Sequence, residues 1–377
     1  MKVDKITLLP ASIPYIDDPM PEWVEQWGIQ LFINVNVEDK EGLGEVLVAG
    51  SGVISAYIGI FNDLIIPFLE GKEIRSISEV YETLEKLLFS AGLCSITLGS
   101  ISGIETALWH VYSKVINKPV HYLLGGKIRD TVPVYASFPR YKTLEDVVSA
   151  VEKAIKRGFK LIKLHQPPNM VIESLKKIKD TFGDQIKVAV DLNSPFDYAS
   201  ALKFLEEISR YDIEWVEEPI YPPNDYDTIK RLTKDFPIAC GENEYTLHGF
   251  KKLLETGVLY IQPDIAKIGG ISKFLKVIDL AEVYNIKIMP HLRPQRSAIA
   301  LYHTLQVASA RNNIIQVEFP LAEIPKDLFG VEFKIFNGMV NVPDDISIDK
   351  ELLKNKYSLK DKKLRLLKFS DLTEKIL

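Results

Sequence analysis

Three carboxylates in this chain have the spacing of a divalent-cation site. Asp191 in V-A-V-D-L-N, Glu217 in W-V-E-E-P and Glu242 in I-A-C-G-E-N each stand at the end of a short strand-like run. They lie roughly 25 residues apart, about the length of one strand–helix repeat of a β/α barrel, so neighbouring strands would bring them together. Three carboxylates at close quarters repel one another, and hard oxygen ligands suit Mg²⁺. We therefore predict that these three residues bind magnesium.

Further polar residues stand at the ends of the other strand-like runs. Lys163 and His165 in L-I-K-L-H are two positions apart, as are Asp191 and Asn193, and side chains two apart on a strand point to the same side. Later runs end in Asp264, His291 and Glu318. One such residue is commonly a helix cap or a solvated loop residue. Seven strand ends in succession indicate a site instead, because charges inside a protein are costly unless they are paired or bind a metal.

The elements that would position these residues are eight short β-branched runs separated by amphipathic stretches. The runs are V-P-V-Y-A-S, L-I-K-L-H, K-V-A-V-D-L-N, W-V-E-E-P, I-A-C-G-E-N, Y-I-Q-P-D-I, K-I-M-P-H-L and I-I-Q-V-E-F. The stretches between them include helical patterns at 144–157, 171–182, 198–209 and 272–284. Eight strand–helix repeats with strands of this buried type predict a closed parallel barrel of the TIM type, with its site at the carboxyl ends of the strands.

The first third of the chain follows a different pattern. Residues 29–39 and 42–49 read as a hairpin, and helical patterns follow at 78–91 and 102–115. The sequence of 377 residues is longer than a barrel of about 250 residues requires. We expect an α+β capping domain at 1–125, the barrel at 126–345, and a C-terminal segment at 346–377 that packs back on the capping domain and completes it.

Composition excludes several classes of function. The net charge of −5 argues against nucleic acid as a partner. No apolar run reaches the roughly 18 residues that a membrane span requires, and the N-terminus lacks a signal-peptide core. The two cysteines, Cys94 and Cys240, suit a reducing compartment, and Cys240 reads as a small core residue. We expect a cytoplasmic protein with no membrane partner.

Over nearly its whole length the chain resembles the enolase superfamily, and within it the mandelate racemase-like subgroup. The segment I-S-G-I-E-T-A-L-W-H-V-Y-S-K and the following K-P-V-H-Y-L-L-G-G-K are similar to the junction between capping domain and barrel. His110 replaces the usual Asp there, which we interpret as a structural variation. The three metal-ligand positions of the family fall on Asp191, Glu217 and Glu242.

The sixth run decides the subgroup. Five residues before Gly269, the muconate cycloisomerase-like members carry a catalytic lysine, whereas this chain has Asp264. Paired with His291 in M-P-H-L, it resembles the Asp–His dyad of the mandelate racemase-like subgroup. Lys267, in P-D-I-A-K-I-G-G, reads as support for the rim rather than as a base. The chain departs from the frequent Lys-x-Lys of the second run with Lys163-Leu164-His165, so His165 remains open as a base, a hydrogen-bond donor or a bystander.

The resemblance implies magnesium-dependent removal of the proton α to a carboxylate. In that chemistry Lys163, Asn193 and Glu318 would contact the substrate, and Glu318 could donate a hydrogen bond to the substrate carboxylate. His291, with its tautomer set by Asp264, would be the general acid and base that protonates a departing β-hydroxyl. Lys163, His165, Asp264, His291 and Glu318 are therefore the expected catalytic residues.

The expected substrate is a small-molecule acid sugar, dehydrated to a 2-keto-3-deoxy acid. The Pro-rich segment L-P-A-S-I-P-Y-I-D-D-P-M-P-E-W reads as a loop facing the substrate, in which Tyr15, Asp17, Asp18 and Trp23 either contact hydroxyls or are ordinary loop residues. Arg293 and Arg296 either bind a distal group or form salt bridges. The resemblance also implies a homo-oligomer.

Three other functions compete with this interpretation. A racemase or epimerase of a 2-hydroxy acid would use His165 and His291 as opposed bases. A catalytically idle barrel would serve only as a binding module, which the full set of polar strand ends disfavours. A barrel for phosphorylated substrates would carry a Gly-rich phosphate loop after its last strand, where this chain has E-F-P-L-A-E-I-P.

Overall fold

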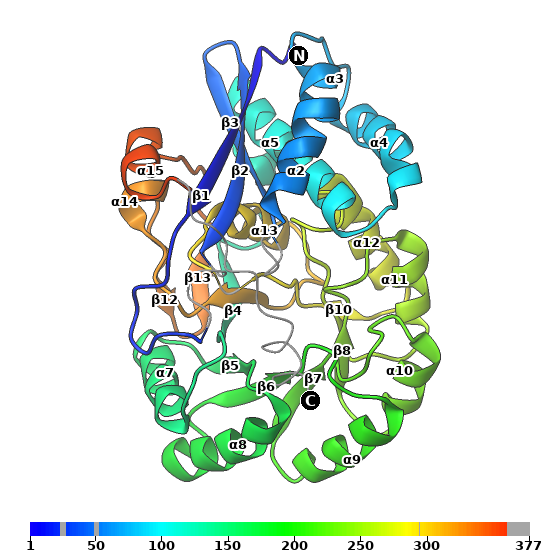
Figure 1. The fold of residues 1–377 in the computed structure, drawn as a ribbon, viewed down its shortest axis with the longest axis vertical. Coiled ribbons are helices and arrows are strands. Elements are labelled where there is room, and N and C mark those ends of the chain that lie inside the picture. Colours follow the sequence, from blue (N-terminus) through cyan, green and yellow to red (C-terminus); the bar gives the residue numbers. More distant parts are fainter. Residues whose placement is uncertain (23–27, 49–52, 294, 360–377) are drawn as a thin grey trace.

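The computed structural model describes residues 1–22, 28–48, 53–293 and 295–359. The chain folds into a capping domain and a barrel that lie against each other, and the two are drawn in blue to cyan and in green to orange (Figure 1). The connection between them runs from helix α6 (Val120–Leu123) to strand β4 (Thr131–Ser137).

The barrel contains eight parallel strands, as the sequence predicts. They are β4, β5 (Leu161–Leu164), β6 (Lys187–Asp191), β7 (Ile213–Glu217), β8 (Ile238–Cys240), β9 (Tyr260–Ile261), β10 (Lys287–Ile288) and β11 (Val317–Pro320). Each of β4 to β9 pairs with the next strand along the chain, and β11 pairs with β4. A parallel bridge between Ile288 and Ile314 joins β10 to the residues before β11 and closes the ring. Several strands are shorter than their runs, so Asp264 and His291 lie just beyond the strand ends.

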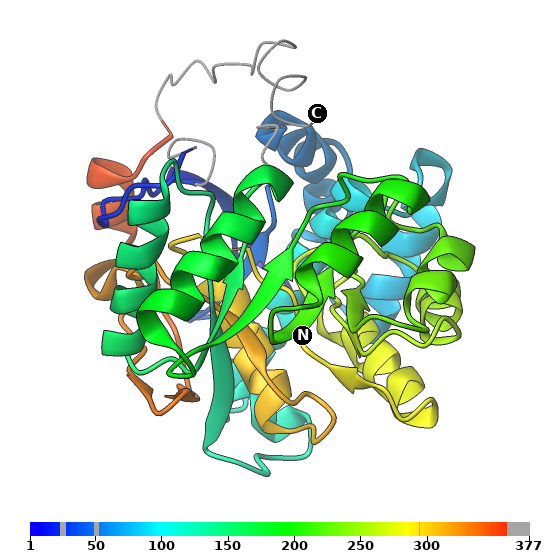
Figure 2. The same cartoon turned by 90° about the horizontal axis from the view of Figure 1, so that it is seen from below.

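Helices connect the strands and surround the barrel (Figure 2). In chain order they are α7 (Leu144–Lys156), α8 (Pro168–Phe182), α9 (Tyr198–Ile208), α10 (Tyr226–Leu232), α11 (Leu247–Leu254), α12 (Ile271–Val283) and α13 (Ile299–Ser309). Their apolar faces pack on the strands in one continuous core. A four-residue helix, α14 (Lys326–Phe329), follows β11, and a hairpin of β12 (Ile335–Phe336) and β13 (Met339–Asn341) pairs with the start of β4.

The capping domain is a three-stranded antiparallel sheet covered by helices. Its strands are β1 (Lys5–Ser12), β2 (Ile29–Val37) and β3 (Lys40–Val46), and the predicted hairpin corresponds to β2 and β3. The helical segments are α2 (Ile54–Ile60), η1 (Phe61–Ile65), α3 (Ile66–Leu69), α4 (Ile77–Leu88), η2 (Phe89–Ala91) and the long α5 (Ser95–Val115). Helix α5 begins seven residues before the predicted 102–115, because its sequence is buried along most of its length.

The structure corrects the extent of the expected loop that begins at Leu9. Residues Leu9 to Ser12 pair with β2 in the register Leu9–Phe32 to Ser12–Ile29, so the irregular segment begins at Ile13. Near the other end of the chain, helix α15 (Lys350–Lys356) is followed by a bridge between Ser358 and Ala11, and Ser12 N donates to Tyr357 O at 2.7 Å. The described part of the C-terminal segment therefore lies along β1. The expected helical segment continues beyond Leu359, outside the described residues.

The interior of the barrel is layered. An apolar layer made of one residue from each of five strands and the residue directly after β10 lies inside it: Tyr135, Leu161, Ala189, Trp215, Ala239 and Met289. Because inward-facing positions recur every second residue, the next inward position along several strands is a charged residue of the predicted site. No helix within the described residues is both long and apolar enough to cross a membrane.

Candidate metal centre and acid–base pair

The predicted site residues meet at the carboxyl ends of the strands, directly above the apolar layer. The inward alternation places four of them two positions after a residue of that layer, in the pairs Leu161 and Lys163, Ala189 and Asp191, Trp215 and Glu217, and Met289 and His291. The apolar layer below excludes water from one side of the charged groups. Electrostatic interactions between these groups are therefore weakly screened.

The three predicted metal ligands form one cluster. Each of Asp191, Glu217 and Glu242 offers a carboxylate oxygen, and these oxygens lie within 4.8 Å of one another. Asp191 and Glu217 are buried, at 1% and 0% exposure. Three carboxylates in a volume that one cation can span are the donor set expected for a hard divalent ion such as Mg²⁺.

Lys163 lies among carboxylates on three strands. Its Nζ is 2.8 Å from Glu217 Oε1, 3.2 Å from Asp191 Oδ2 and 3.1 Å from Glu318 Oε1, and the side chain is fully buried. Burial alone would lower the pKa of Lys163, but Glu217, Glu318 and Asp191 outweigh it and raise that pKa well above its usual value. The lysine is therefore held as a cation between two predicted metal ligands and Glu318.

Asp191 is held by two polar residues that the sequence placed at strand ends, His165 and Asn193. His165 Nε2 is 2.7 Å from Asp191 Oδ2, and Asn193 donates to Asp191 Oδ1 through both its backbone N, at 3.0 Å, and its Nδ2, at 2.8 Å. Burial would raise the pKa of Asp191, but His165 and Lys163 outweigh it and hold that pKa well below its usual range. In this arrangement Asn193 orients a predicted ligand.

His291 links the carboxylate cluster to Asp264. Its Nδ1 is 2.6 Å from Asp264 Oδ2, and its Nε2 is 2.8 Å from Glu242 Oε2. Burial would lower the pKa of His291, but Glu242, Glu318 and the hydrogen bond to Asp264 outweigh it and raise that pKa well above its usual value. Glu318 lies beside this pair, where its Oε2 accepts from Leu292 N at 3.0 Å. The geometry brings together a histidine, its orienting carboxylate and a predicted metal ligand.

The buried charges fit a divalent cation. Burial, and next to it the charge of Asp191, raise the pKa of Glu217 well above its usual value although Lys163 is close. The adjacent Glu218 has its pKa raised to about 8, mainly by burial and then by the charge of Glu242. Metal binding requires ionised ligands, and a cation between Asp191, Glu217 and Glu242 would offset the repulsion that opposes ionisation. The residues present therefore fit Mg²⁺.

Lys267 occupies the rim, as the sequence suggested. It donates to Asn243 Oδ1 at 3.0 Å, and Asn243 Nδ2 in turn donates to Glu218 Oε2 at 2.8 Å and to Glu242 Oε1 at 2.9 Å. The lysine is thereby linked through Asn243 to the carboxylate of Glu242.

Two residues that contact Glu217 were not identified from the sequence. Gln262 Nε2 donates to Glu217 Oε2, and Trp215 Nε1 lies 3.4 Å from the same oxygen. Gln262 stands two positions before Asp264, and Trp215 stands two positions before Glu217. The inward alternation that selected the charged residues could have selected these two polar groups as well.

Among the residues considered for substrate contact, Arg296 and Asp17 bind backbone groups of other segments. Arg296 donates to Glu323 O at 2.7 Å and to Pro14 O at 2.8 Å, and Asp17 accepts from Glu323 N at 2.7 Å. These contacts join the segment after β1 to the segment after β11. Tyr15 is buried, Arg293 donates to Val48 O, Asp18 is exposed, and Trp23 lies outside the described residues.

Two further expectations concern residues outside the cluster. Cys240 is buried in the main core, as expected for a packing residue. His110 Nδ1 accepts from Leu43 N at 3.0 Å, and its Nε2 is 2.8 Å from Asp345 Oδ1. The histidine that replaces the family's usual Asp therefore connects β3 to the segment after β13.

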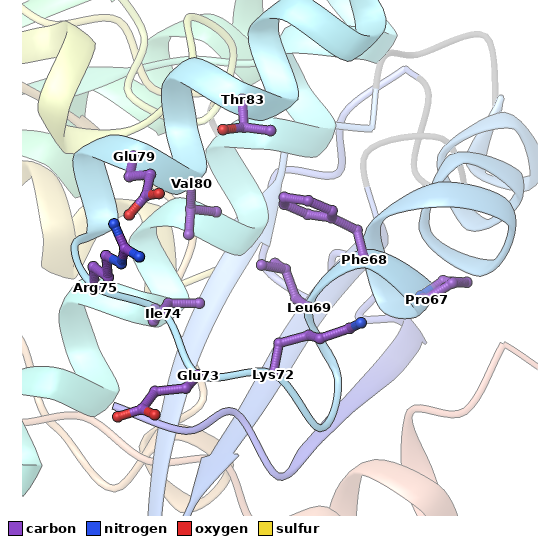
Figure 3. Close-up of a pocket in the computed structure, with 10 residues that line it drawn as sticks. All are labelled: Pro67, Phe68, Leu69, Lys72, Glu73, Ile74, Arg75, Glu79, Val80 and Thr83. Atoms are coloured by element: carbon purple, nitrogen blue, oxygen red, sulfur yellow. The ribbon is translucent and has the colours of Figure 1, made fainter.

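A separate hollow of about 500 Å³ lies in the capping domain between α3 and α4 (Figure 3). Phe68, Leu69 and Val80 line it together with charged groups, among them Lys72 and Glu79. It shares no lining residue with the carboxylate cluster, so the two features are distinct.

Comparison with known proteins identifies the family. Residues 23–125 match the family described as the mandelate racemase / muconate lactonizing enzyme N-terminal domain, and residues 146–349 match the enolase C-terminal domain-like family. The chain is 31% identical over 328 residues to D-xylonate dehydratase of Haloferax volcanii, covering 79% of this chain and 78% of that protein. It is 31% identical over 315 residues to arabinonate dehydratase of Saccharolobus solfataricus, covering 80% and 82%.

A solved structure extends the similarity to the whole fold. The 3,6-anhydro-D-galactonate cycloisomerase of Zobellia galactanivorans superposes with a TM-score of 0.80 at 26% identity, covering 95% of this chain and 100% of that one. Both domain matches and the site geometry agree with the resemblance noted in the sequence. The chain belongs to the enolase superfamily and, within it, to the mandelate racemase-like enzymes.

Proposed function

We propose that this enzyme is a magnesium-dependent acid-sugar dehydratase that converts an aldonate to a 2-keto-3-deoxy acid. The observation that carries the proposal is the position of His291, which reaches Asp264 with one ring nitrogen and Glu242 with the other. An acid–base group thus lies against a cluster that can hold a cation. Two relatives at 31% identity that bear the names of aldonate dehydratases support the same class of reaction.

Each residue has a role in the proposed chemistry. Asp191, Glu217 and Glu242 would hold Mg²⁺, which as a Lewis acid stabilises the second negative charge that the substrate carboxylate acquires when the C2 proton leaves. Lys163 adds a fixed positive charge beside Asp191 and Glu217, and Glu318 lies at 3.1 Å from its Nζ. Because Lys163 and Glu318 are both buried, they can meet the substrate carboxylate without reorganising water.

His291 carries the proton in this scheme. Loss of the C2 proton and of the C3 hydroxyl, which leaves with a proton as water, gives an enol that tautomerises to the 2-keto-3-deoxy acid. Asp264 accepts from Nδ1 of the imidazole and so leaves Nε2 as the atom that gives or takes the proton. His165 is the second imidazole at the site, and its Nε2 is engaged with Asp191. An epimerase using His165 and His291 as opposed bases is the rival.

The test is turnover of a panel of aldonates and aldarates with Mg²⁺, assayed for 2-keto acid. We expect His291→Asn to lower kcat by about 10²- to 10⁴-fold, the range for loss of a general acid–base group, while metal binding persists. His248→Asn is the matched control, because His248 is exposed on α11. Full activity in His291→Asn would exclude His291 as the proton carrier.

We extend the proposal to the setting of the enzyme. A homo-oligomer in the cytoplasm is what the sequence and its resemblance imply. Light scattering of the purified protein tests for the homo-oligomer, and a mass of one chain would contradict it.

A further inference from the structure

Two carboxylates of the capping domain are buried away from the metal cluster. Glu45 on β3 is 2% exposed, and Glu105 on α5 is 0% exposed. Neither belongs to the polar strand ends. Each instead accepts hydrogen bonds from the start of a barrel helix, and those two helices follow Asp264 and His291 in the chain.

Glu105 holds the start of α12. Its Oε2 accepts from Ile271 N at 2.7 Å, and its Oε1 accepts from Ser272 N at 2.9 Å and from Trp109 Nε1 at 2.8 Å. A Cβ on Gly270, where φ is +87°, would lie 2.1 Å from Glu105 Oε2. The glycine pair of P-D-I-A-K-I-G-G therefore allows the backbone to approach this carboxylate.

The same helix of the capping domain holds the residue before Gly270. Gly269 N donates to Ser102 Oγ at 2.7 Å, and Ser102 lies one turn before Glu105 on α5. Within the segment, Ala266 N donates to Asp264 Oδ1 at 2.7 Å, which leaves Oδ2 for His291. The residues from Asp264 to the start of α12 are thus attached to α5 at three backbone nitrogens.

Glu45 holds the start of α13 in the same manner. Its Oε2 accepts from Ala300 N at 2.9 Å and from Ser297 Oγ, and its Oε1 accepts from Gln295 Nε2 at 2.9 Å. These donors lie four to nine residues after His291 in the chain. A narrow cavity between the domains is lined by both Glu45 and Asp264, so the carboxylate lies near the pair that it would influence.

Strand β3 and helix α5 carry these two carboxylates as one closely packed unit. A Cβ on Gly44 would lie 1.9 Å from Gly103 O, and one on Gly42 would lie 2.3 Å from Ala107 O. The glycines of G-L-G-E therefore let α5 lie directly on β3. Movement of the capping domain would displace the starts of α12 and α13 together.

Four of the other barrel helices supply their own caps. Helices α7, α9, α10 and α11 begin with their own side-chain caps, which are Thr143, Asp197, Asp225 and Thr246. Helices α12 and α13 have Gly270 and Ala298 at that position and no side-chain cap of their own. The first N–H groups of a helix require acceptors, and a carboxylate is favourable there. Helix α8, which follows Pro167, also has no side-chain cap. At α12 and α13 the capping domain supplies the acceptors.

We propose that Glu45 and Glu105 are positioning residues through which the capping domain sets the geometry of the Asp264–His291 pair. The pair depends on the relative placement of two sets of described residues, 264–272 on one side and 291–293 with 295–300 on the other, and each is held by one of these carboxylates. The expected effect on turnover rests on the proposed function, whereas the expected effect on the position of His291 does not. A misplacement of about 1 Å at a reacting group can lower a rate about 10²-fold, so modest shifts of either segment matter.

The test compares Glu45→Gln and Glu105→Gln with Glu85→Gln. Glutamine keeps the shape but replaces one acceptor oxygen with an NH₂ group. Glu85 is the matched control, because it also reaches from the capping domain to α12, where it pairs with Lys273 at 2.9 Å instead of with backbone N–H groups. Kinetics with Mg²⁺ and the best substrate of the panel are measured together with the imidazole ¹H–¹⁵N spectrum, in which His291→Asn identifies the His291 signals.

We expect the two site variants to lose kcat by roughly 10- to 100-fold with KM nearly unchanged, and to shift the His291 ring signals, while Glu85→Gln does neither. Wild-type kcat and unshifted His291 signals in both variants would overturn the proposal, as would an equal loss in the control. If a Gln variant does not fold, Ser102→Ala removes one acceptor from the same segment and should shift the same signals. If the wild type turns over no aldonate, the proposed function fails, and the His291 spectrum alone decides the positioning role.

Discussion

His303 on α13 offers a quantitative test of how tightly the capping domain is docked. The ring is fully buried, and its Nε2 donates to Leu43 O, in G-L-G-E of β3, at 2.8 Å. Its Nδ1 contacts no hydrogen-bond partner within the described part of the chain. Burial, and after it the neighbouring His110, lower the pKa of His303 to about 3. The histidine is therefore neutral in the folded protein.

This shift links stability to pH with a definite sign. An unperturbed histidine has a pKa of about 6.5, so between about 3 and 6.5 the unfolded chain binds a proton that folded His303 does not. The stability that the neutral ring contributes is fully present above pH 6.5 and is lost as the pH falls. At pH 5, about 1.5 units below the unfolded pKa, this loss is about 2 kcal/mol.

The perturbation is His303→Gln, because Gln Nε2 can still donate to Leu43 O but does not titrate. The free energy of unfolding is measured with urea at pH 8 and pH 5 for the wild type, for the variant, and for the exposed-site control His248→Gln. We expect the variant to lose about 2 kcal/mol less than the wild type between these pH values, and the control to behave like the wild type. An unchanged pH dependence in His303→Gln would refute the assignment of a buried neutral ring at this contact.

Three further predictions address the barrel and the docking unit. Lys163→Met leaves three buried carboxylates without their shared cation. The variant should destabilise the metal-free protein by about 3–5 kcal/mol, measured by urea unfolding. An unchanged free energy of unfolding would contradict the ion-pair assignment. Gly44→Ala places a methyl group against Gly103 O, 1.9 Å away, and should lower the thermal midpoint clearly, whereas Gly59→Ala, with open space around it, should not. Saturating Mg²⁺ at about 100 times its Kd should add about 2.7 kcal/mol of stability, and Asp191→Asn should abolish most of this gain. An equal gain in the variant would place the ion elsewhere.

The sequence predicted those parts of the site that depend on local periodicity. The i, i+2 pairs Lys163–His165 and Asp191–Asn193 lie on the same side because alternation along a strand is a local property. Eight strand-like runs were sufficient for the barrel, since a parallel strand requires a crossover to its neighbour. The meeting of Asp191, Glu217 and Glu242 followed from that topology.

What the sequence did not reveal depends on contacts between distant residues. Glu105 reaches Ile271 N, 166 positions away, and Glu45 reaches Ala300 N, 255 positions away. Neither side chain carries a local signal, because a Glu in a strand or in a helix is ordinary. Strand β1 was missed over Leu9–Ser12 because Pro10 reads as a loop residue, although it lies on an outer strand of the three-stranded sheet where proline is tolerated.

The most direct test of the central claim is an NMR experiment in D₂O with the wild-type enzyme, Mg²⁺ and the aldonate that it consumes fastest. The proposed dehydration predicts a 2-keto-3-deoxy acid that carries deuterium at C3, because the enol is protonated there from solvent, and recovered substrate without deuterium at C2. Deuterium at C2 of the recovered substrate, with no keto acid formed, would contradict dehydration and establish the epimerase instead.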